Sequence, residues 1–250
     1  MQGQKNSNRI FPMNTQLQPI GIIHSCFKEK FGIPRQPGLA PEATATLELL
    51  PPWDREEAVR GLEAFSHVWI LFLFHGAAQQ GWKPTVRPPR LGGNRRIGVF
   101  ASRSPFRPNP VGLSAVELGP IERREGRLLL QLRGVDLLDG TPVLDIKPYL
   151  PYADSIPDAR GGFADRAPQG GIGIAFSAEA ERFLTTLEEG EGRRLKRLIV
   201  QLLEQDPRPA YLDNNPRRKE FGMRLFDYNI RWSLADASAT VLSIVPASSG

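Results

Sequence analysis

The sequence predicts a mainly β protein with an α+β C-terminal part, in which an antiparallel β-barrel N-terminal domain precedes a small C-terminal domain of helices and a hairpin. Seven short segments before residue 151 are rich in β-branched or aromatic residues and are bounded by Gly, Pro or Asp, as strands are. Little helical pattern separates them, which favours an antiparallel sheet that closes on itself and leaves no open edge. Apart from one stretch, helical periodicity appears only after residue 176.

The expected strands comprise residues 20–25, 44–50, 67–74, 96–101, 112–119, 127–135 and 141–150. Residues 68–74 are apolar throughout, which is typical of a strand buried on both faces. Only residues 54–65 read as a helix in this half of the chain. A βαβ nucleotide-binding fold is disfavoured because the crossover helices that join parallel strands are missing.

The C-terminal part begins with a long irregular connection, since Pro and Gly accumulate between residues 148 and 173. Ser177 can cap a helix that runs to about Glu189, and leucines at helical spacing predict a second helix that ends before Pro207. Alternating residues predict a strand over 224–234 that pairs with 239–245 through a turn at 235–238. We therefore expect a flexible tail at 1–15, a barrel domain at 16–158 and a C-terminal domain at 159–250.

Composition indicates an anionic partner. The chain has 250 residues, a formal net charge of +5, and arginine as 25 of its 32 basic residues. The planar guanidinium suits phosphates, carboxylates and base faces, although a basic but inert surface is an alternative. The single cysteine, Cys26, excludes an internal disulfide and is expected to fill space, and three scattered histidines predict no metal site. No apolar run of about 20 residues and no signal peptide is present, so we expect a cytoplasmic protein without a membrane partner.

The segment "GVFASRSPFRPNPVGLS" at 98–114 predicts a rigid binding loop. Its three prolines, at positions 105, 108 and 110, each fix φ and remove a backbone donor, so residues 103–110 form neither a helix nor a central strand. A rigid loop loses little entropy when Arg103, Arg107 and Asn109 engage a ligand. Alternatively, the arginines pair with acids such as Glu117 and the prolines only shape a corner of the barrel.

Two further loops rich in Pro and Gly carry arginine. They are 30–41, with Arg35, and 82–96, with four arginines. Three stiff cationic loops on one β scaffold predict an anion-binding site at its rim. The dinucleotide-binding, Walker, zinc-protease and serine-hydrolase motifs are all missing, so none of these chemistries is indicated.

The strand at 224–234 places Phe226, Tyr228 and Ile230, with Trp232 and Leu234, on one face. Asp227, Asn229 and Arg231 then point the other way, at a spacing of about 7 Å. This row is either part of a site or the solvated face of an edge hairpin.

Seven motifs follow one another along the chain: "PRQPGL" (34–39), "GLEAFSHVWILFLFH" (61–75), "RPPRLGG" (87–93), "GVFASRSPFRPNPVGLS" (98–114), "DLLDGTPVLDIKPYLP" (136–151), "DPRPAY" (206–211) and "FDYNIRW" (226–232). Together they resemble the TsaA-like family, and within it the tRNA (adenine-N6)-methyltransferases. The resemblance implies an N-terminal β-barrel, a small C-terminal domain and a homodimer. It also implies methyl transfer from S-adenosylmethionine to N6 of N6-threonylcarbamoyladenosine at position 37, in the anticodon loop of threonine tRNA.

The resemblance assigns roles to residues that match its motifs. The implied cofactor-binding residues are Arg35, Gln36, Pro37, Gly38, Leu39, His75, Gly76, Arg103, Leu113, Arg133, Gly134, Val135 and Asp136. The implied catalytic residues, on the tRNA side, are Asp227, Asn229 and Arg231. We expect Arg107, Asn109, Lys147 and Tyr149 to contact the substrate.

Proton removal is expected to matter, because the acceptor nitrogen is conjugated with the purine and a carbonyl and is a poor nucleophile. Our hypothesis is that Asp227 is the general base, held by Arg231, while Asn229 orients the modified base. Two other classes of function are alternatives. A non-catalytic RNA-binding module would explain the charge but not the rigid rim loops, and a small-molecule hydrolase would need a nucleophile–base pair that no motif supplies.

Overall fold

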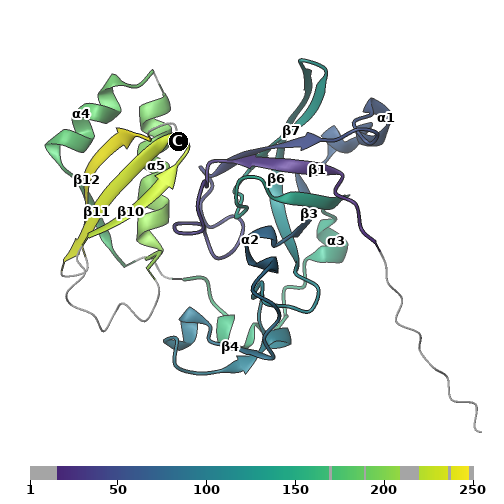
Figure 1. Ribbon diagram of the computed structural model, residues 1–250, viewed down its shortest axis with the longest axis horizontal. Helices are drawn as coiled ribbons and strands as arrows, with labels where there is room; N and C mark the ends of the chain where they lie inside the picture. The colour runs from purple at the N-terminus through teal and green to yellow at the C-terminus, as the bar shows by residue number, and fades with distance from the viewer. Residues whose placement is uncertain (1–15, 169–170, 189, 209–219, 236–237, 248–250) are drawn as a thin grey trace, which may run out of the picture.

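The computed structural model describes residues 16–168, 171–188, 190–208, 220–235 and 238–247. The predicted tail at 1–15 and the turn residues 236 and 237 lie outside these ranges. Six strands form a closed barrel in the order β1-β2-β7-β6-β3-β8, in which every neighbouring pair is antiparallel (Figure 1). They are β1 (Gly21–Ser25), β2 (Thr44–Leu49), β3 (His67–Leu73), β6 (Val111–Arg124), β7 (Arg127–Arg133) and β8 (Pro142–Pro148). The predicted antiparallel barrel is confirmed.

Strand β3 differs from its prediction in burial. Val68, Ile70 and Phe72 point into the barrel and are at most 5% exposed. The alternate side chains, among them Trp69 and Leu73, are only partly buried. These two line a cavity together with the inward-facing Phe72, so the continuous apolar run of 68–74 serves both the barrel core and a binding site.

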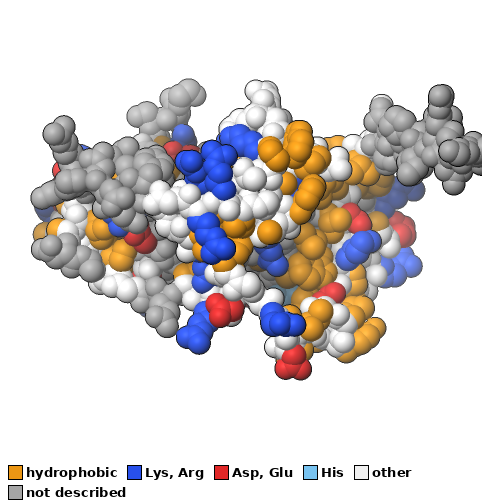
Figure 2. Space-filling view, turned by 90° about the horizontal axis from the view of Figure 1, so that it is seen from below, with side chains coloured by type: hydrophobic (Ala, Val, Ile, Leu, Met, Phe, Trp, Pro, Cys, Tyr) orange, Lys and Arg blue, Asp and Glu red, His pale blue; other side chains and the backbone are white. Residues whose placement is uncertain are grey.

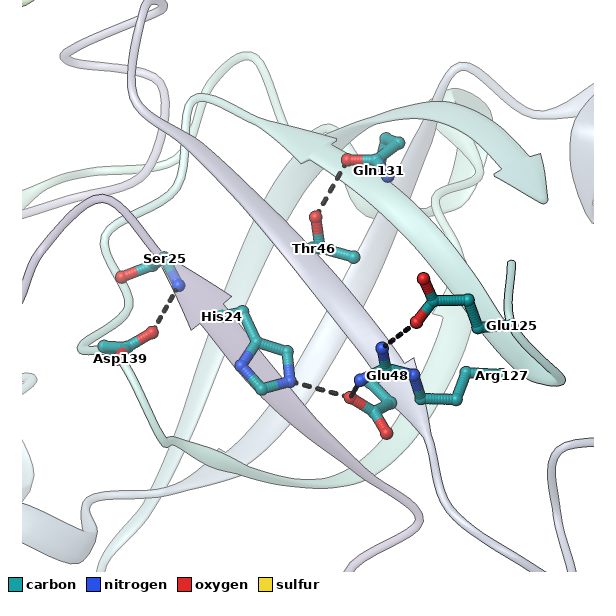
Figure 3. A network of polar contacts seen from close by, with 8 residues as sticks. All are labelled: His24, Ser25, Thr46, Glu48, Glu125, Arg127, Gln131 and Asp139. Carbon is teal, nitrogen blue, oxygen red and sulfur yellow. Dashed lines mark hydrogen bonds and ion pairs between the residues drawn. The ribbon is translucent and has the colours of Figure 1, made fainter. Parts of the chain in front are cut away.

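The outer face of β1, β2 and β7 is polar (Figure 3). His24 contacts Glu48 at 2.9 Å, and Glu48 in turn lies 3.5 Å from Arg127. Thr46 donates a hydrogen bond of 2.9 Å to Gln131 on the neighbouring strand. Exposed pairs of this kind stabilise a fold little, but they leave this side of the barrel solvated.

Two expected elements of the barrel domain are shorter than predicted. The helix expected at 54–65 is reduced to α1 (Glu56–Val59) and the 3₁₀ turn η1 (Leu62–Ala64), because Gly61 between them has a φ of +85°. The strand expected at 96–101 is only β5 (Ile97–Gly98), which pairs with β4 (Thr85–Val86) and continues as the 3₁₀ turn η3 (Val99–Ala101). The remaining short helical pieces are α2 (His75–Ala78), η2 (Pro89–Leu91), α3 (Pro151–Asp154) and η4 (Gly162–Ala164).

The C-terminal part is a four-stranded sheet in the order β10-β11-β12-β9, with two helices against one of its faces (Figure 1). Its elements are β9 (Gly173–Phe176), α4 (Ala178–Thr186), α5 (Glu191–Glu204), β10 (Glu220–Leu225), β11 (Tyr228–Ala235) and β12 (Ser238–Pro246). Ser177 caps α4 as predicted, since its Oγ accepts a hydrogen bond of 3.1 Å from the Ala180 amide. The predicted boundary between residues 158 and 159 falls in the irregular segment that joins α3 to β9.

The strand expected at 224–234 is two strands. A turn at Phe226 and Asp227 separates β10 from β11, and Phe226 has a φ of +51°. Ile230 and Trp232 are fully buried as the alternation predicts, and Trp232 stacks on Phe221 with ring centroids 4.7 Å apart. Asp227 therefore lies in a hairpin turn rather than on the face of a strand.

The barrel and the C-terminal sheet share a continuous apolar core. Cys26 belongs to it and is 1% exposed, and burial raises the pKa of its thiol to about 12. The thiol is therefore protonated and fills space, as predicted. No helix in the described ranges is long and apolar enough to cross a membrane.

Candidate functional site

A cavity of about 630 Å³ opens at one end of the barrel. Five separate segments form its wall: residues 30–36, the end of β3 with α2, residues 102–107, the start of β6, and residues 136–141. This volume is in the range of sites that enclose a nucleoside-sized small molecule.

Aromatic side chains form much of the wall. Phe72 and Phe74 meet edge to face with centroids 5.0 Å apart, and both line the cavity. Trp69 is fixed from behind, because its indole N–H donates a hydrogen bond of 2.9 Å to Asp154 in α3. Gly112 leaves room for the Phe72 ring, since a Cβ at this position would lie 2.2 Å from ring atom Cζ. Flat apolar walls of this kind suit a purine ring.

The loop at 102–110 is irregular, as its prolines predict, and Arg107 holds it together from within. The Arg107 guanidinium donates to the carbonyl oxygens of Val99 at 3.2 Å and Ser102 at 2.8 Å. Arg103 reaches across the cavity wall and donates to the side-chain oxygen of Gln36. These two arginines bond to backbone and amide groups rather than to Glu117, so the alternative that they pair with that acid is not what the structure shows.

The loop at 30–41 forms another part of the cavity wall. Lys30 donates its Nζ to the carbonyl oxygen of Gly76, just after β3. Gly38 donates its amide to the carbonyl oxygen of Gly134 at 2.8 Å, and Gly134 has a φ of +66° that favours glycine. This loop is therefore tied to two other parts of the cavity wall.

The C-terminal domain supports the same loop from behind. Gln205, just after α5, donates a hydrogen bond of 2.9 Å to the carbonyl oxygen of Leu39. Glu42 accepts from Arg197 of α5 at 2.9 Å, and its amide donates to Gln201 at 3.0 Å. The loop thus lies between the cavity and α5.

Asp136 is the one acidic residue that lines the cavity in the described part of the chain. Its Oδ1 accepts a hydrogen bond of 2.6 Å from Ser114 Oγ on β6. Burial raises the pKa of Asp136 to about 6, although the Ser114 hydrogen bond and the nearby Arg103 charge act in the opposite direction. Such a perturbed carboxyl in a cleft is a mark of functional sites.

The structure brings part of the predicted cofactor set together. The predicted residues that line the cavity are Arg35, Gln36, His75, Gly76, Arg103, Leu113, Asp136 and, from the substrate set, Arg107. The predicted residues outside its lining are Pro37, Gly38, Leu39, Arg133, Gly134, Val135, Asn109, Lys147 and Tyr149. Gly38, Leu39 and Gly134 lie behind the cavity wall. Gly38 donates its amide to the Gly134 carbonyl oxygen, and the Leu39 carbonyl oxygen accepts from Gln205.

The lining also contains residues that the sequence did not single out. They are chiefly the aromatic residues Trp69, Phe72, Phe74 and Phe106, with Lys30 and Ser114. The continuous apolar run of β3 is the signal for Trp69 and Phe72, but burial on both faces is the simpler interpretation of such a run. Within the described ranges, no group of three His, Cys, Asp or Glu side chains could hold a metal ion.

The segment at 82–96 does not line the cavity, although the sequence predicted that it would join the other two loops at one site. It carries β4 and lies at the lower end of the molecule in Figure 1. Seen from that end, Lys and Arg side chains spread around an apolar area (Figure 2). The segment supports the site indirectly, because the Lys83 amide donates to the Phe106 carbonyl oxygen at 3.1 Å.

Asp227, Asn229 and Arg231 do not line the cavity of their own chain. Arg231 pairs with Glu220 at 2.7 Å rather than with Asp227, which corrects the expected contact between the two. The turn that carries Asp227 nevertheless lies where the two domains meet, since the Phe226 amide donates to the Cys26 carbonyl oxygen at 2.8 Å.

Comparisons with known proteins agree with this architecture. Residues 22–155 match the family model of the tRNA-methyltransferase O N-terminal domain, and residues 170–247 match that of the TrmO C-terminal domain. The chain is 51% identical over 231 residues to the tRNA (adenine(37)-N6)-methyltransferase of Escherichia coli, covering 92% of this chain and 98% of that protein. It is 54% identical over 224 residues to a putative S-adenosylmethionine-dependent methyltransferase of Pseudomonas aeruginosa, covering 88% and 93% of the two chains.

A crystal structure of TrmO from Pseudomonas aeruginosa superposes with a TM-score of 0.74 at 47% sequence identity, covering 93% of this chain and 99% of that one. The resemblance drawn from the motifs is confirmed, and this chain belongs to the tRNA-methyltransferase O (TrmO) family.

Proposed function

We propose that this chain transfers a methyl group from S-adenosylmethionine to N6 of adenine 37 in tRNA. The acceptor is N6-threonylcarbamoyladenosine of threonine tRNA, and the active form is a homodimer. One observation carries the proposal: family residues from four distant segments, namely Arg35, His75, Arg103 and Asp136, meet around one cavity. The names of the relatives support the coarser activity, since they describe tRNA (adenine(37)-N6)- and S-adenosylmethionine-dependent methyltransferases.

The residues of the cavity fit S-adenosylmethionine. Aromatic walls at Phe72, Phe74 and Trp69 suit the adenine ring. Arg103, at the junction of two loops, suits the carboxylate of the methionine part. Asp136, the one acidic residue of the lining among the described residues, suits a cofactor that also carries positive charge.

When bound, the cofactor supplies a sulfonium-activated methyl group, so the tasks left to the protein are alignment, exclusion of water and handling of one proton. The loop at 30–41, tied to Gly76, Gly134 and α5, orients the ligand with little freedom to move. Apolar residues at the cavity wall exclude water from the reacting atoms.

Asp227 remains our candidate for the base that removes the N6 proton. Because Asp227 does not line the cavity of its own chain, the homodimer is the arrangement in which the C-terminal domain of a second copy supplies it. In single-turnover experiments, Asp227→Asn should slow methylation at saturating S-adenosylmethionine while cofactor binding stays intact. A near-normal rate would remove Asp227 from this role.

In this function the domain at 16–158 binds the cofactor and the domain at 159–250 forms the tRNA side of the site. Because the substrate is a tRNA, the protein acts in the cytoplasm. Its partner is the anticodon loop, whose single-stranded bases can splay out to meet arginines and aromatics.

Nucleoside analysis of tRNA from a strain that lacks the gene tests the proposal. The methylated form of threonylcarbamoyladenosine should disappear and return with the wild-type gene but not with Arg103→Ala. Calorimetry with S-adenosylmethionine separates the alternative, a non-catalytic RNA-binding module, which should give no heat of cofactor binding. Persistence of the methylated nucleoside at its normal level would reject the tRNA substrate.

A further inference from the structure

The cavity contains one carboxyl among cationic groups. The charged or titratable side chains that line it are Lys30, Arg35, His75, Arg103, Arg107 and Asp136. A ligand that carries net positive charge is repelled by four of these groups at neutral pH. In the described part of the lining, only Asp136 can attract it.

Ser114 holds this carboxyl in place. Ser114 lies on β6 opposite Ile70 of β3, and it is 1% exposed. Its Oγ donates a hydrogen bond of 2.6 Å to Asp136 Oδ1. Burial raises the pKa of Asp136 to about 6, so the carboxyl is mostly ionised at neutral pH and is poorly solvated. A partly buried carboxylate of this kind is stabilised by a cation placed beside it.

We propose that the carboxylate of Asp136 is the counter-charge for the sulfonium of S-adenosylmethionine, and that it makes the cavity prefer this cofactor to its demethylated product. This inference rests on the proposed function. At neutral pH the amino and carboxylate charges of the methionine part cancel, so the sulfonium gives the cofactor its net positive charge. S-adenosylhomocysteine has a neutral thioether in the same place and is otherwise the same molecule. The ratio of the affinities for S-adenosylmethionine and S-adenosylhomocysteine therefore measures how strongly the cavity interacts with the sulfonium charge.

The preference has a consequence for turnover. Methyl transfer removes the positive charge from sulfur, so the attraction to Asp136 is lost in the step that forms the product. Product release is favoured without any movement of the cavity wall. Asp136 is thus a specificity-determining residue for the cofactor, distinct from the proton acceptor at Asp227.

Isothermal titration calorimetry of the full chain with each ligand tests the inference. Asp136→Asn removes the charge but keeps an oxygen that Ser114 can bond. We expect it to weaken the binding of S-adenosylmethionine by about tenfold or more, while the affinity for S-adenosylhomocysteine changes by less than about threefold. Asp158→Asn is the matched control, because Asp158 is exposed, does not line the cavity and carries the same charge. The control should leave both affinities unchanged.

Equal losses for both ligands would overturn the inference, because they would assign Asp136 to a group that the two ligands share, such as a ribose hydroxyl. Unchanged affinities would also overturn it. If wild-type protein binds neither ligand, the proposed function fails instead, and the two failures are thereby distinguished.

A second measurement serves if Asp136→Asn does not fold. In a His75→Gln chain, the pH dependence of the two affinities reports on the Asp136 carboxyl. The ratio of the two affinities should shift toward S-adenosylhomocysteine as the pH falls through about 6. A ratio that stays constant over this range would contradict the inference.

Discussion

Replacing Gly112 by alanine should deform the cavity from its aromatic side. Gly112 on β6 lies directly opposite Phe72 on β3, and the Phe72 ring covers the position that a side chain would occupy. A Cβ at Gly112 would lie 2.2, 2.5 and 2.7 Å from three atoms of that ring, well inside the 3.4–4 Å of an ordinary van der Waals contact. The ring has to move, and the barrel core on its other side is closely packed.

Overpacking of this kind destabilises a protein by about 1–3 kcal/mol. For a chain of this size, each kcal/mol lowers the melting temperature by about 2–4 °C. Because Phe72 also lines the cavity, its displacement should weaken the binding of S-adenosylmethionine by roughly tenfold, which corresponds to a loss of about 1.4 kcal/mol of binding free energy. Differential scanning fluorimetry and calorimetry measure the two effects on the same preparation.

Gly98→Ala is the matched control, since a Cβ there meets nothing within 4 Å and its φ of −59° suits alanine. It should change neither property. The double variant Gly112→Ala with Phe72→Leu should lose less stability than the sum of the single variants, because leucine lacks the ring atoms that clash. Wild-type stability and affinity in Gly112→Ala would refute the reasoning.

Three further predictions concern stability and support of the site. Burial raises the pKa of Asp136 from 3.8 to about 6, so the folded chain binds more protons than the unfolded chain between these values and loses stability as the pH rises through them. Asp136→Asn should therefore stabilise the ligand-free protein by up to about 3 kcal/mol at pH 7.5 and not at pH 4, as measured by urea unfolding, and equal stability of the two chains at pH 7.5 would contradict this. Gln205→Ala removes the 2.9 Å hydrogen bond to Leu39, and we expect a loss of about 1 kcal/mol together with cofactor affinity reduced a few-fold. Calorimetry showing full affinity would mean that this hydrogen bond does not support the cofactor site. Ser177→Ala removes the cap of α4 and the 2.7 Å bond to the Leu242 carbonyl oxygen, so unfolding should become easier by about 1 kcal/mol while cofactor binding is unchanged, and a change in affinity alone would be the contrary result.

Local chemistry in the sequence was sufficient for the strand segments, for the irregular loop at 102–110 and for the start of α4. These features depend on neighbours in the chain: proline fixes φ, a serine caps the next turn, and β-branched residues alternate with polar ones. The same local rules missed the break at Gly61 and the turn at Phe226, because a pattern of apolar residues does not show where a backbone adopts a positive φ. The sequence therefore predicts that Asp227 lies within a strand, whereas it lies in the turn between β10 and β11.

The sequence determined that this chain has a barrel made from its first 150 residues and that Arg35, His75, Arg103 and Asp136 are among the residues to examine. Only the tertiary structure decided that they share a cavity, that 82–96 lies outside it, and that Trp69 and Phe72 complete its wall. The physical reason is that the cavity is formed by strand order and side-chain direction: β3 lies between β6 and β8 only after the barrel closes. No local pattern contains that information, because the residues that meet are separated by up to about a hundred positions of chain.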